Sequence, residues 1–347
     1  MIFFIIRLDN FIMRSECISL HDDADFKILL ANNKGKIVVE EHDIRPLLFN
    51  PLLHDAIGYI RFDTLKNHPF LLLIIPPDEW DFEPHTIGEC DRKYDSYSTG
   101  FQLLALSFSL AAWLVKDSCV AVQKGYWMNC FNNYVSISTT SYEPTNSAGI
   151  IKATSFSEKE IHQIFDNMDL LGNYLFRFGS GIPLAKGSHG GTRYISQEKA
   201  AGLLGNTGKS FTRALLKLQE ARRVGDVTSK IEYGCSALEA LYAISEDHKY
   251  NLSSITAGFI GASDEDKDRI RKLMKIAYDI RSDHSHGDFI EYLKLNSIES
   301  LTQVSCDMDV VLRKVFRKVL RKPDLNYSSD PEDIERVRIY WDSIRSS

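Results

Sequence analysis

One short segment of the chain gathers residue types that are able to cleave a phosphodiester bond. It runs Tyr278-Asp-Ile-Arg281-Ser-Asp-His284-Ser-His286-Gly287. An arginine holds a phosphate bidentately while keeping its charge, and a histidine titrates near neutral pH and moves a proton. The pair Arg281 and His286 therefore suits phosphodiester cleavage without a metal ion.

The residues before this segment predict a helix over 264–284. Its apolar positions follow helical spacing: Leu273, Ile276, Ala277 and Ile280. On a straight helix Arg281 and His284 share one face, whereas Arg281 and His286 are five residues apart and diverge. Convergence of Arg281 and His286 therefore needs a bend near Gly287, or a second chain that supplies the other half.

A structural interpretation of the same residues is also open. In it Arg281 pairs with an acidic neighbour and the histidines cap the last turn, since charged helix ends are common. His284 is then an exposed side chain, and the alternative is an accessory group of a catalytic site. Tyr278 and Asp283 belong to the same accessory set.

A second segment upstream makes the pattern more specific. Ser236-Ala-Leu-Glu239-Ala-Leu-Tyr242 precedes two expected short helices, and then come Arg281, His286 and Gly287. In this combination the chain resembles the ApeA-like branch of the HEPN superfamily, over roughly residues 196–321. The signature of that superfamily is an Arg, four to six residues, and a His.

The resemblance implies a helical bundle that forms a homodimer, so that two Arg/His pairs face one cleft. It also implies a metal-independent endoribonuclease without a cofactor, in which His286 assists attack of the RNA 2′-hydroxyl and Arg281 stabilises the developing charge. The expected substrate is single-stranded RNA or a tRNA loop. Glu239 matches the acidic position of the family, where it either orients Arg281 or His286 or forms a buried ion pair.

A basic repeat favours contact with RNA. Arg313-Lys314, Arg317-Lys318 and Arg321-Lys322 recur every four residues of an expected helix over 297–321, opposite an apolar face. The predicted RNA-binding residues are Arg313, Arg317, Lys318 and Arg321. A merely solvated helix face is the alternative, but the cluster is unusual in a chain of net charge -6.

The length of 347 residues indicates two domains of ordinary size. Residues 1–155 alternate short β-rich runs with turns and predict an α+β sensor or regulatory domain, with an apolar helix over 101–115 on a sheet. Asn32-Asn-Lys-Gly35 between two apolar runs predicts a hairpin turn. No catalytic group is recognised there, because the histidines are isolated.

From Ser157 onward the pattern is helical. Ser157-Glu-Lys-Glu160 has the spacing of a capping box and predicts a helix over 158–177. Residues 156–195 are interpreted as this connecting helix and a glycine-rich loop over 178–192. An all-α HEPN-type bundle follows over 196–325, with helices at 196–223, 227–245, 250–259, 264–284 and 297–321. A polar tail helix is expected over 326–347.

Several other patterns are set aside. The segment from Gly202 to Ser210 ends like a phosphate-binding loop, but Leu203 replaces the required glycine and a helix rather than a strand is expected before it. Six single cysteines give no zinc or dithiol pair and indicate free thiols in the cytoplasm. The apolar start of the chain predicts a strand, and no segment has the length of a membrane span.

The resemblance also implies a toxin or an anti-phage effector of abortive infection. Such a nuclease needs restraint, so we expect residues 1–155 to receive a trigger or inhibitor protein. The competing class is a non-enzymatic HEPN module that dimerises or docks a partner. Geometry separates the two, because catalysis requires Arg281 and His286 to face one accessible cleft.

Overall fold

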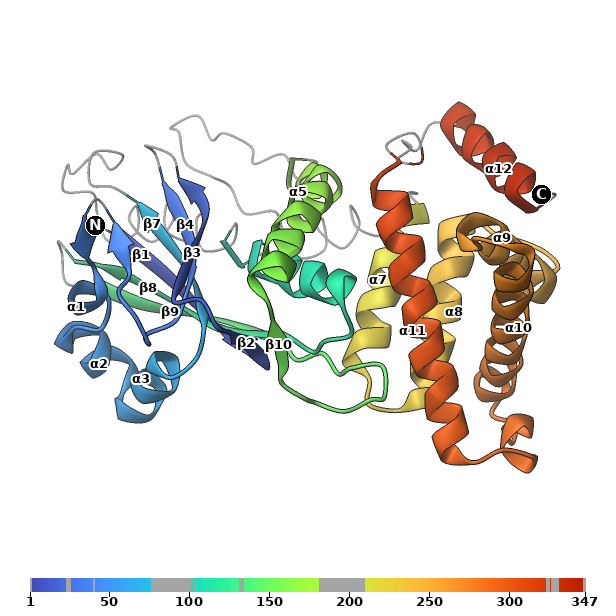
Figure 1. The fold of residues 1–347 in the computed structure, drawn as a ribbon, viewed down its shortest axis with the longest axis horizontal. Coiled ribbons are helices and arrows are strands. Elements are labelled where there is room, and N and C mark those ends of the chain that lie inside the picture. The colour runs from blue at the N-terminus through green and yellow to red at the C-terminus, as the bar shows by residue number, and fades with distance from the viewer. Residues whose placement is uncertain are drawn as a thin grey trace, which may run out of the picture.

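The computed structural model describes residues 2–22, 26–39, 41–75, 101–102, 104–130, 134–180, 210–322, 325 and 331–345. Within these ranges a β-rich N-terminal region is followed by a helical C-terminal region (Figure 1). The expected order of an α+β part and then helices is therefore confirmed at this level. No helix among these residues is both long enough and apolar enough to cross a membrane.

Six strands form the main sheet, in the order β3-β4-β7-β1-β8-β9. Each strand pairs antiparallel with its neighbours. Their bounds are β1 Ile2–Asp9, β3 Cys17–Asp22, β4 Lys27–Ala31, β7 Phe70–Ile75, β8 Ala121–Asn129 and β9 Tyr134–Tyr142. The strand expected at the start of the chain is thus β1, a central strand with both faces covered.

Alternate residues of β1 enter two different cores, as the twofold period of a strand requires. Phe3 and Ile5 pack against the helices α1 (Arg45–Leu48), α2 (Pro51–Ile57) and α3 (Tyr59–Lys66). Phe4, Ile6 and Leu8 belong to the larger core, together with Phe108 from the helical residues 104–115. The apolar helix expected over 101–115 therefore covers one face of the sheet.

The prediction of a hairpin at Asn32-Asn-Lys-Gly35 is wrong, although a turn is present. Strand β5 (Val38–Val39) pairs with β6 (His42–Asp43) and not with β4. Both edges of β4 are already occupied by β3 and β7, so no edge remains for β5. The side chain of Asn32 holds the turn instead, since it donates to Ser15 O at 2.8 Å and accepts from Lys34 N at 2.9 Å.

The capping box at Ser157 is confirmed. The backbone amide of Ser157 donates to Glu160 Oε2 at 2.8 Å, and the Glu160 amide lies 3.4 Å from Ser157 Oγ. Helix α5 (Glu158–Ser180) begins here. It follows the small parallel pair of β2 (Phe11–Met13) and β10 (Thr154–Phe156). The remainder of the predicted glycine-rich loop lies outside the described residues.

The helical region confirms most of the predicted segments. Its helices are α7 (Ser210–Arg223), α8 (Val227–Tyr242), α9 (His248–Ile260), α10 (Asp264–His286), the 3₁₀ turn η2 (Glu291–Lys294), α11 (Ile298–Leu320) and α12 (Pro331–Arg345). Residues 196–209, which include most of the rejected phosphate-loop pattern, lie outside the described residues.

Helix α12 is more than a polar tail. Trp341 is buried and its ring meets Tyr242 of α8 and Phe259 of α9, with centroid distances of 4.7 and 5.1 Å. Val337 is buried on the same side. Because most described residues of α12 are exposed, its few apolar residues do not stand out in the sequence. The helix nevertheless packs on the bundle through them.

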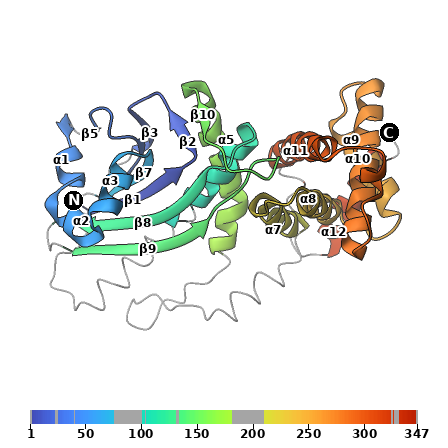
Figure 2. The same cartoon turned by 90° about the horizontal axis from the view of Figure 1, so that it is seen from below.

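A strap of the N-terminal region joins it to the helical region. This strap, residues 143–152, passes between α7 and α11, and Figure 2 shows the two regions side by side. Thr145 N donates to Arg222 O at 2.6 Å, and Ser305 Oγ donates to Ser147 O at 2.7 Å. The backbone of Gly149, at φ 77°, lies so close to Gly225 that a Cβ would stand 2.0 Å from its carbonyl oxygen.

Candidate functional site

Arg281 lies on the face of α10 that packs against α8. Its Nη2 is 3.4 Å from Glu239 Oε2, and its guanidinium carbon lies 5.3 Å from the centre of the Tyr278 ring. The side chain is 25% exposed, while its Nε is buried and has no hydrogen-bond partner within the described structure. The arginine is thus held in place with its outer edge accessible to solvent.

Glu239 is the anchor of this group. Its side chain is 12% exposed, and its second oxygen, Oε1, lies 2.9 Å from His248 Nδ1 at the start of α9. Glu239 therefore forms ion pairs with Arg281 and His248, and its role in orienting a catalytic Arg281 stays a prediction. The described contacts of Glu239 do not include His286. His248 also belongs to this group, and the sequence analysis did not identify it.

His284 belongs to a second cluster, at the start of α8. Its Nδ1 lies 2.8 Å from Glu232 Oε2, and its Nε2 lies 3.5 Å from Ser229 Oγ and 3.8 Å from Asp226 Oδ2. The side chain is 31% exposed. A carboxylate that fixes one ring nitrogen leaves the other in a defined direction, as acid–base catalysis requires. The expectation of a merely exposed His284 is therefore wrong.

His286 is exposed and has no hydrogen bond or ion pair among the described contacts. Helix α10 continues unbroken to His286, and the left-handed Gly287 at φ 72° ends it there. The change of direction comes after His286, so five helical residues place it about 140° around the axis from Arg281. The expected pair does not converge within one chain.

Asp283 has a structural task. Its Oδ2 accepts a hydrogen bond from Glu291 N at 2.8 Å, and its carbonyl accepts one from Asp288 N at 2.9 Å. These bonds fix the turn between α10 and η2. Tyr278 is half-buried beneath Arg281, and burial raises the pKa of its hydroxyl.

The basic repeat of α11 does not form a continuous phosphate track. Arg313, 13% exposed, donates from Nε to Asp309 Oδ2 at 2.8 Å, and Arg317 Nε donates to the Arg313 carbonyl at 3.2 Å. Lys318 donates to the carbonyl of Phe259 and lies over its ring. Arg321 alone of the four is exposed without a described contact. The apolar face of α11 is buried as expected, Arg313 and Arg317 bond to acceptors on α11 itself, and Lys318 bonds to α9.

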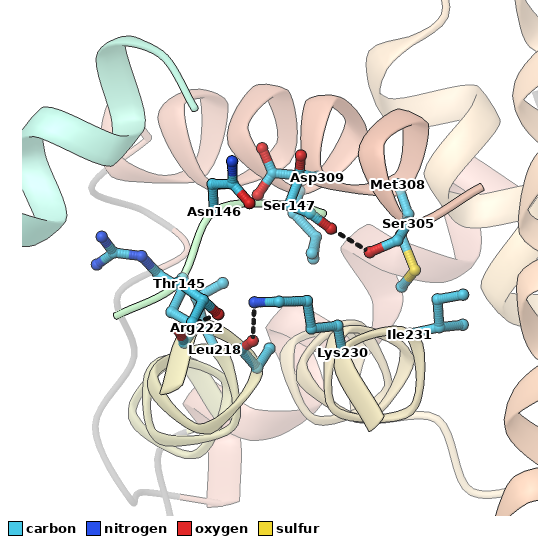
Figure 3. A pocket seen from close by; sticks show the side chains of 12 residues that line it. Thr145, Asn146, Ser147, Leu218, Arg222, Lys230, Ile231, Ser305, Met308 and Asp309 are labelled. Atoms are coloured by element: carbon cyan, nitrogen blue, oxygen red, sulfur yellow. Dashed lines mark hydrogen bonds between the residues drawn. The ribbon is translucent and has the colours of Figure 1, made fainter. Parts of the chain in front are cut away.

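A buried charged cluster lies where the strap meets the helical region, and sequence reasoning missed it. Lys230 of α8 reaches between α7 and α11, and its Nζ donates to Ala221 O at 2.9 Å (Figure 3). Asp309 accepts from Trp113 Nε1 at 2.7 Å as well as from Arg313. Arg222 donates to Tyr142 Oη at 3.2 Å. A cavity of about 20 Å³ beside Lys230 has room for one water-sized molecule.

We predict that Lys230 makes stability depend on pH. Burial, and then the charge of Arg222, lower the pKa of Lys230 to about 8 from 10.5. Below pH 8 the folded protein carries the full cost of a buried ammonium, and this cost disappears as the pH rises to 10.5, because the unfolded chain then binds more protons. The free energy of unfolding of the wild type, relative to Lys230→Met, is therefore expected to rise across this window.

Urea unfolding at several pH values measures this difference. Lys217→Met, at an exposed lysine on the adjacent α7, serves as the matched control. A flat difference for Lys230→Met would show that Lys230 titrates normally in the folded protein.

The described residues include no group of three or more His, Cys, Asp or Glu side chains arranged to hold a metal ion. The five cysteines among them are all free thiols. The chain matches no protein-family model, and neither a curated protein nor a solved structure is significantly similar to it.

Proposed function

We propose that the protein is a metal-independent endoribonuclease whose helical region is an HEPN-type domain. The observation that supports this most directly is the setting of Arg281, a partly accessible arginine held by Glu239 and Tyr278. Two histidines with carboxylate partners on α8 lie on either side of it in the sequence, His248 at the start of α9 and His284 one turn further along α10. A fixed cation beside oriented imidazoles is a suitable arrangement for phosphodiester cleavage.

In this proposal His286 takes the proton of the RNA 2′-hydroxyl as it attacks the adjacent phosphate, and Arg281 stabilises the negative charge that develops. The P–O5′ bond breaks, the leaving 5′-oxygen takes up a proton from solvent water, and a 2′,3′-cyclic phosphate remains. Because Arg281 and His286 diverge on α10, the pair is completed by a second copy of the chain. Phe289, Leu295 and Ile298, which follow His286 in the chain, are exposed, Leu295 by 93%, and offer apolar side chains to such a copy.

The same proposal includes a cellular role as a toxin or anti-phage effector acting on cytoplasmic RNA. Free cysteines suit a reducing compartment. The N-terminal region would receive the trigger, and the strap offers a physical route from it to α7 and α11. Helix α7 packs in turn against α8, which carries Glu232 and Glu239.

Cleavage of labelled single-stranded RNA and of total tRNA in the presence of EDTA tests the activity. We expect wild type to produce cyclic-phosphate ends, and Arg281→Ala and His286→Ala to cut at least about 100-fold more slowly, as loss of an acid–base group or a charge stabiliser requires. Circular dichroism checks that the variants are folded. The matched control is Lys272→Ala, an exposed cation on α10. Equal background cutting by all four proteins would end the proposal.

A non-enzymatic module is the second candidate, and two observations favour it. Arg281 is already paired with Glu239, and α10 is unbroken between Arg281 and His286. The same helices would then only dimerise or dock a partner. This candidate predicts that the chain self-associates while Arg281→Ala leaves every RNA intact, as wild type does.

A further inference from the structure

A cleft of about 620 Å³ opens on the helical region, between α7, α8 and the start of α9, with α12 at its rim. Its volume falls within the range of pockets that hold small organic ligands. Nothing in the motif of α10 predicts it, because most of its lining comes from other helices. The residues that determine its chemistry are three cations, an apolar floor, the Glu239 carboxylate and the His248 imidazole paired with it.

The cations are Arg213 and Lys217, one turn apart on α7, and Arg338 of α12. All three are exposed. Arg213 has no hydrogen bond or ion pair among the described contacts, and Lys217 only approaches the Tyr233 ring at 5.8 Å. Arg338 makes a long contact of 3.5 Å with Glu335. These charges remain available, in contrast to Arg313 and Lys318 on α11.

The floor of the cleft is apolar and is formed by Leu216, Ala240, Ala243 and Ile244. Leu216 is 45% exposed although it is a leucine in the middle of a helix. Cations around an apolar surface complement a ligand that carries both phosphates and a flat, weakly polar ring. A fully inorganic anion would leave this floor uncovered.

Glu239 links the cleft to the candidate site. It lines the cleft, yet its two oxygens are directed to His248 and Arg281. Its charge is balanced there, and the three cations on the rim leave the cleft net positive. A phosphate bound by these cations would occupy the same cleft as Glu239, which holds Arg281.

We propose that this cleft binds a nucleotide of single-stranded RNA. The base covers Leu216 and Ile244, and the flanking phosphates contact Arg213, Lys217 and Arg338. The inference rests on the proposed function for its substrate class and assigns the RNA contact to the α7–α12 side of the bundle, in place of the α11 repeat. Single strands suit it because their bases are free to leave the stack.

Fluorescence anisotropy of the full-length protein with a labelled 2′-O-methyl oligoribonucleotide tests binding without cleavage. The test protein is the triple variant Arg213→Gln, Lys217→Gln, Arg338→Gln. The control is Lys159→Gln, Arg269→Gln, Lys272→Gln, which removes the same charge from exposed positions elsewhere. On a single strand, log K falls with log salt, and each lost phosphate contact makes this dependence shallower by about 0.7. The loss of three contacts therefore reduces the magnitude of the slope by about 2. We expect the affinity of the test variant to fall by about tenfold or more, and that of the control to change by less than about twofold.

An abasic oligonucleotide of the same length is expected to bind wild type more weakly, since the floor then stays uncovered. The inference is overturned if test and control variants lose the same affinity, if wild type does not bind the oligonucleotide, or if an acidic peptide of equal charge binds as well as RNA. The ribonuclease proposal has a separate outcome. If the cleft binds RNA but wild type never cleaves it, the cleft stands and the catalytic proposal falls.

Discussion

Equal mixtures of the Arg281→Ala and His286→Ala proteins are expected to regain about one quarter of wild-type RNA cleavage, although each variant alone is inactive. In the proposed twofold dimer each site would take Arg281 from one chain and His286 from the other. A mixed dimer keeps one intact site of two, and random exchange makes half of the dimers mixed. The unbroken α10, which separates the two side chains around its axis, is the structural reason to expect a shared site.

The measurement is the initial rate of cleavage after the two variants have been unfolded and refolded together, with each variant refolded alone as the control. A mixture of Arg281→Ala with the double variant Arg281→Ala, His286→Ala contains no complete pair and must stay inactive. Failure of the first mixture to regain activity, while differently tagged copies of the two variants co-purify as mixed dimers, would place both groups of a working site on one chain. Absence of any dimer would remove the second copy from the proposal.

Asp309→Ala is expected to destabilise the protein by about 3–5 kcal/mol, the cost of breaking a buried ion pair by removing one partner. Asp309 accepts hydrogen bonds from Trp113 Nε1 at 2.7 Å and Arg313 Nε at 2.8 Å, and both ionic side chains are only 13% exposed. Removing the carboxylate leaves an indole N–H and a guanidinium without their partner at the contact between the two regions. Urea unfolding at pH 7 measures the loss.

Asp307→Ala is the matched control on the same helix, because Asp307 accepts only an exposed hydrogen bond from Gln303, at 2.9 Å. Its effect is expected to stay within about 0.5 kcal/mol. Asp309→Asn keeps an acceptor for Trp113 but removes the charge facing Arg313, so an intermediate loss is expected. A loss below about 1 kcal/mol for Asp309→Ala would show that water replaces the carboxylate and that the cluster is not closed.

Much of the secondary structure could be predicted because its signals lie within a few residues of one another. The helical spacing of apolar residues before Arg281 predicted α10, the pair Ser157 and Glu160 marked the start of α5, and the apolar start of the chain predicted β1. The apolar stripe of α11 is buried in the same way. Each of these patterns depends on the geometry of one helix or one strand.

The partners of these elements depended on the tertiary structure. Glu239 and Glu232 lie 42 and 52 residues from the side chains that they hold on α10, and no local period connects such positions. The basic repeat of α11 was likewise recognisable in the sequence, but the hydrogen-bond partners of its side chains were not. Asp309 accepts from Arg313 and the Phe259 carbonyl accepts from Lys318. Strand β4 pairs with β3 and β7 and not with the next apolar run in the sequence.

The sequence by itself therefore determined the approximate positions of β1 and of the helices α5, α8, α9, α10 and α11, and that Arg281 and two histidines stand together at the end of one helix. Only the tertiary structure decided that His284 has a carboxylate partner, that His286 points elsewhere, and that Lys230 and Asp309 are enclosed between the two regions. The physical reason is the distance along the sequence over which each kind of interaction acts. Backbone geometry and capping act over a few residues, whereas burial and ion pairing depend on which surfaces meet after the chain has folded.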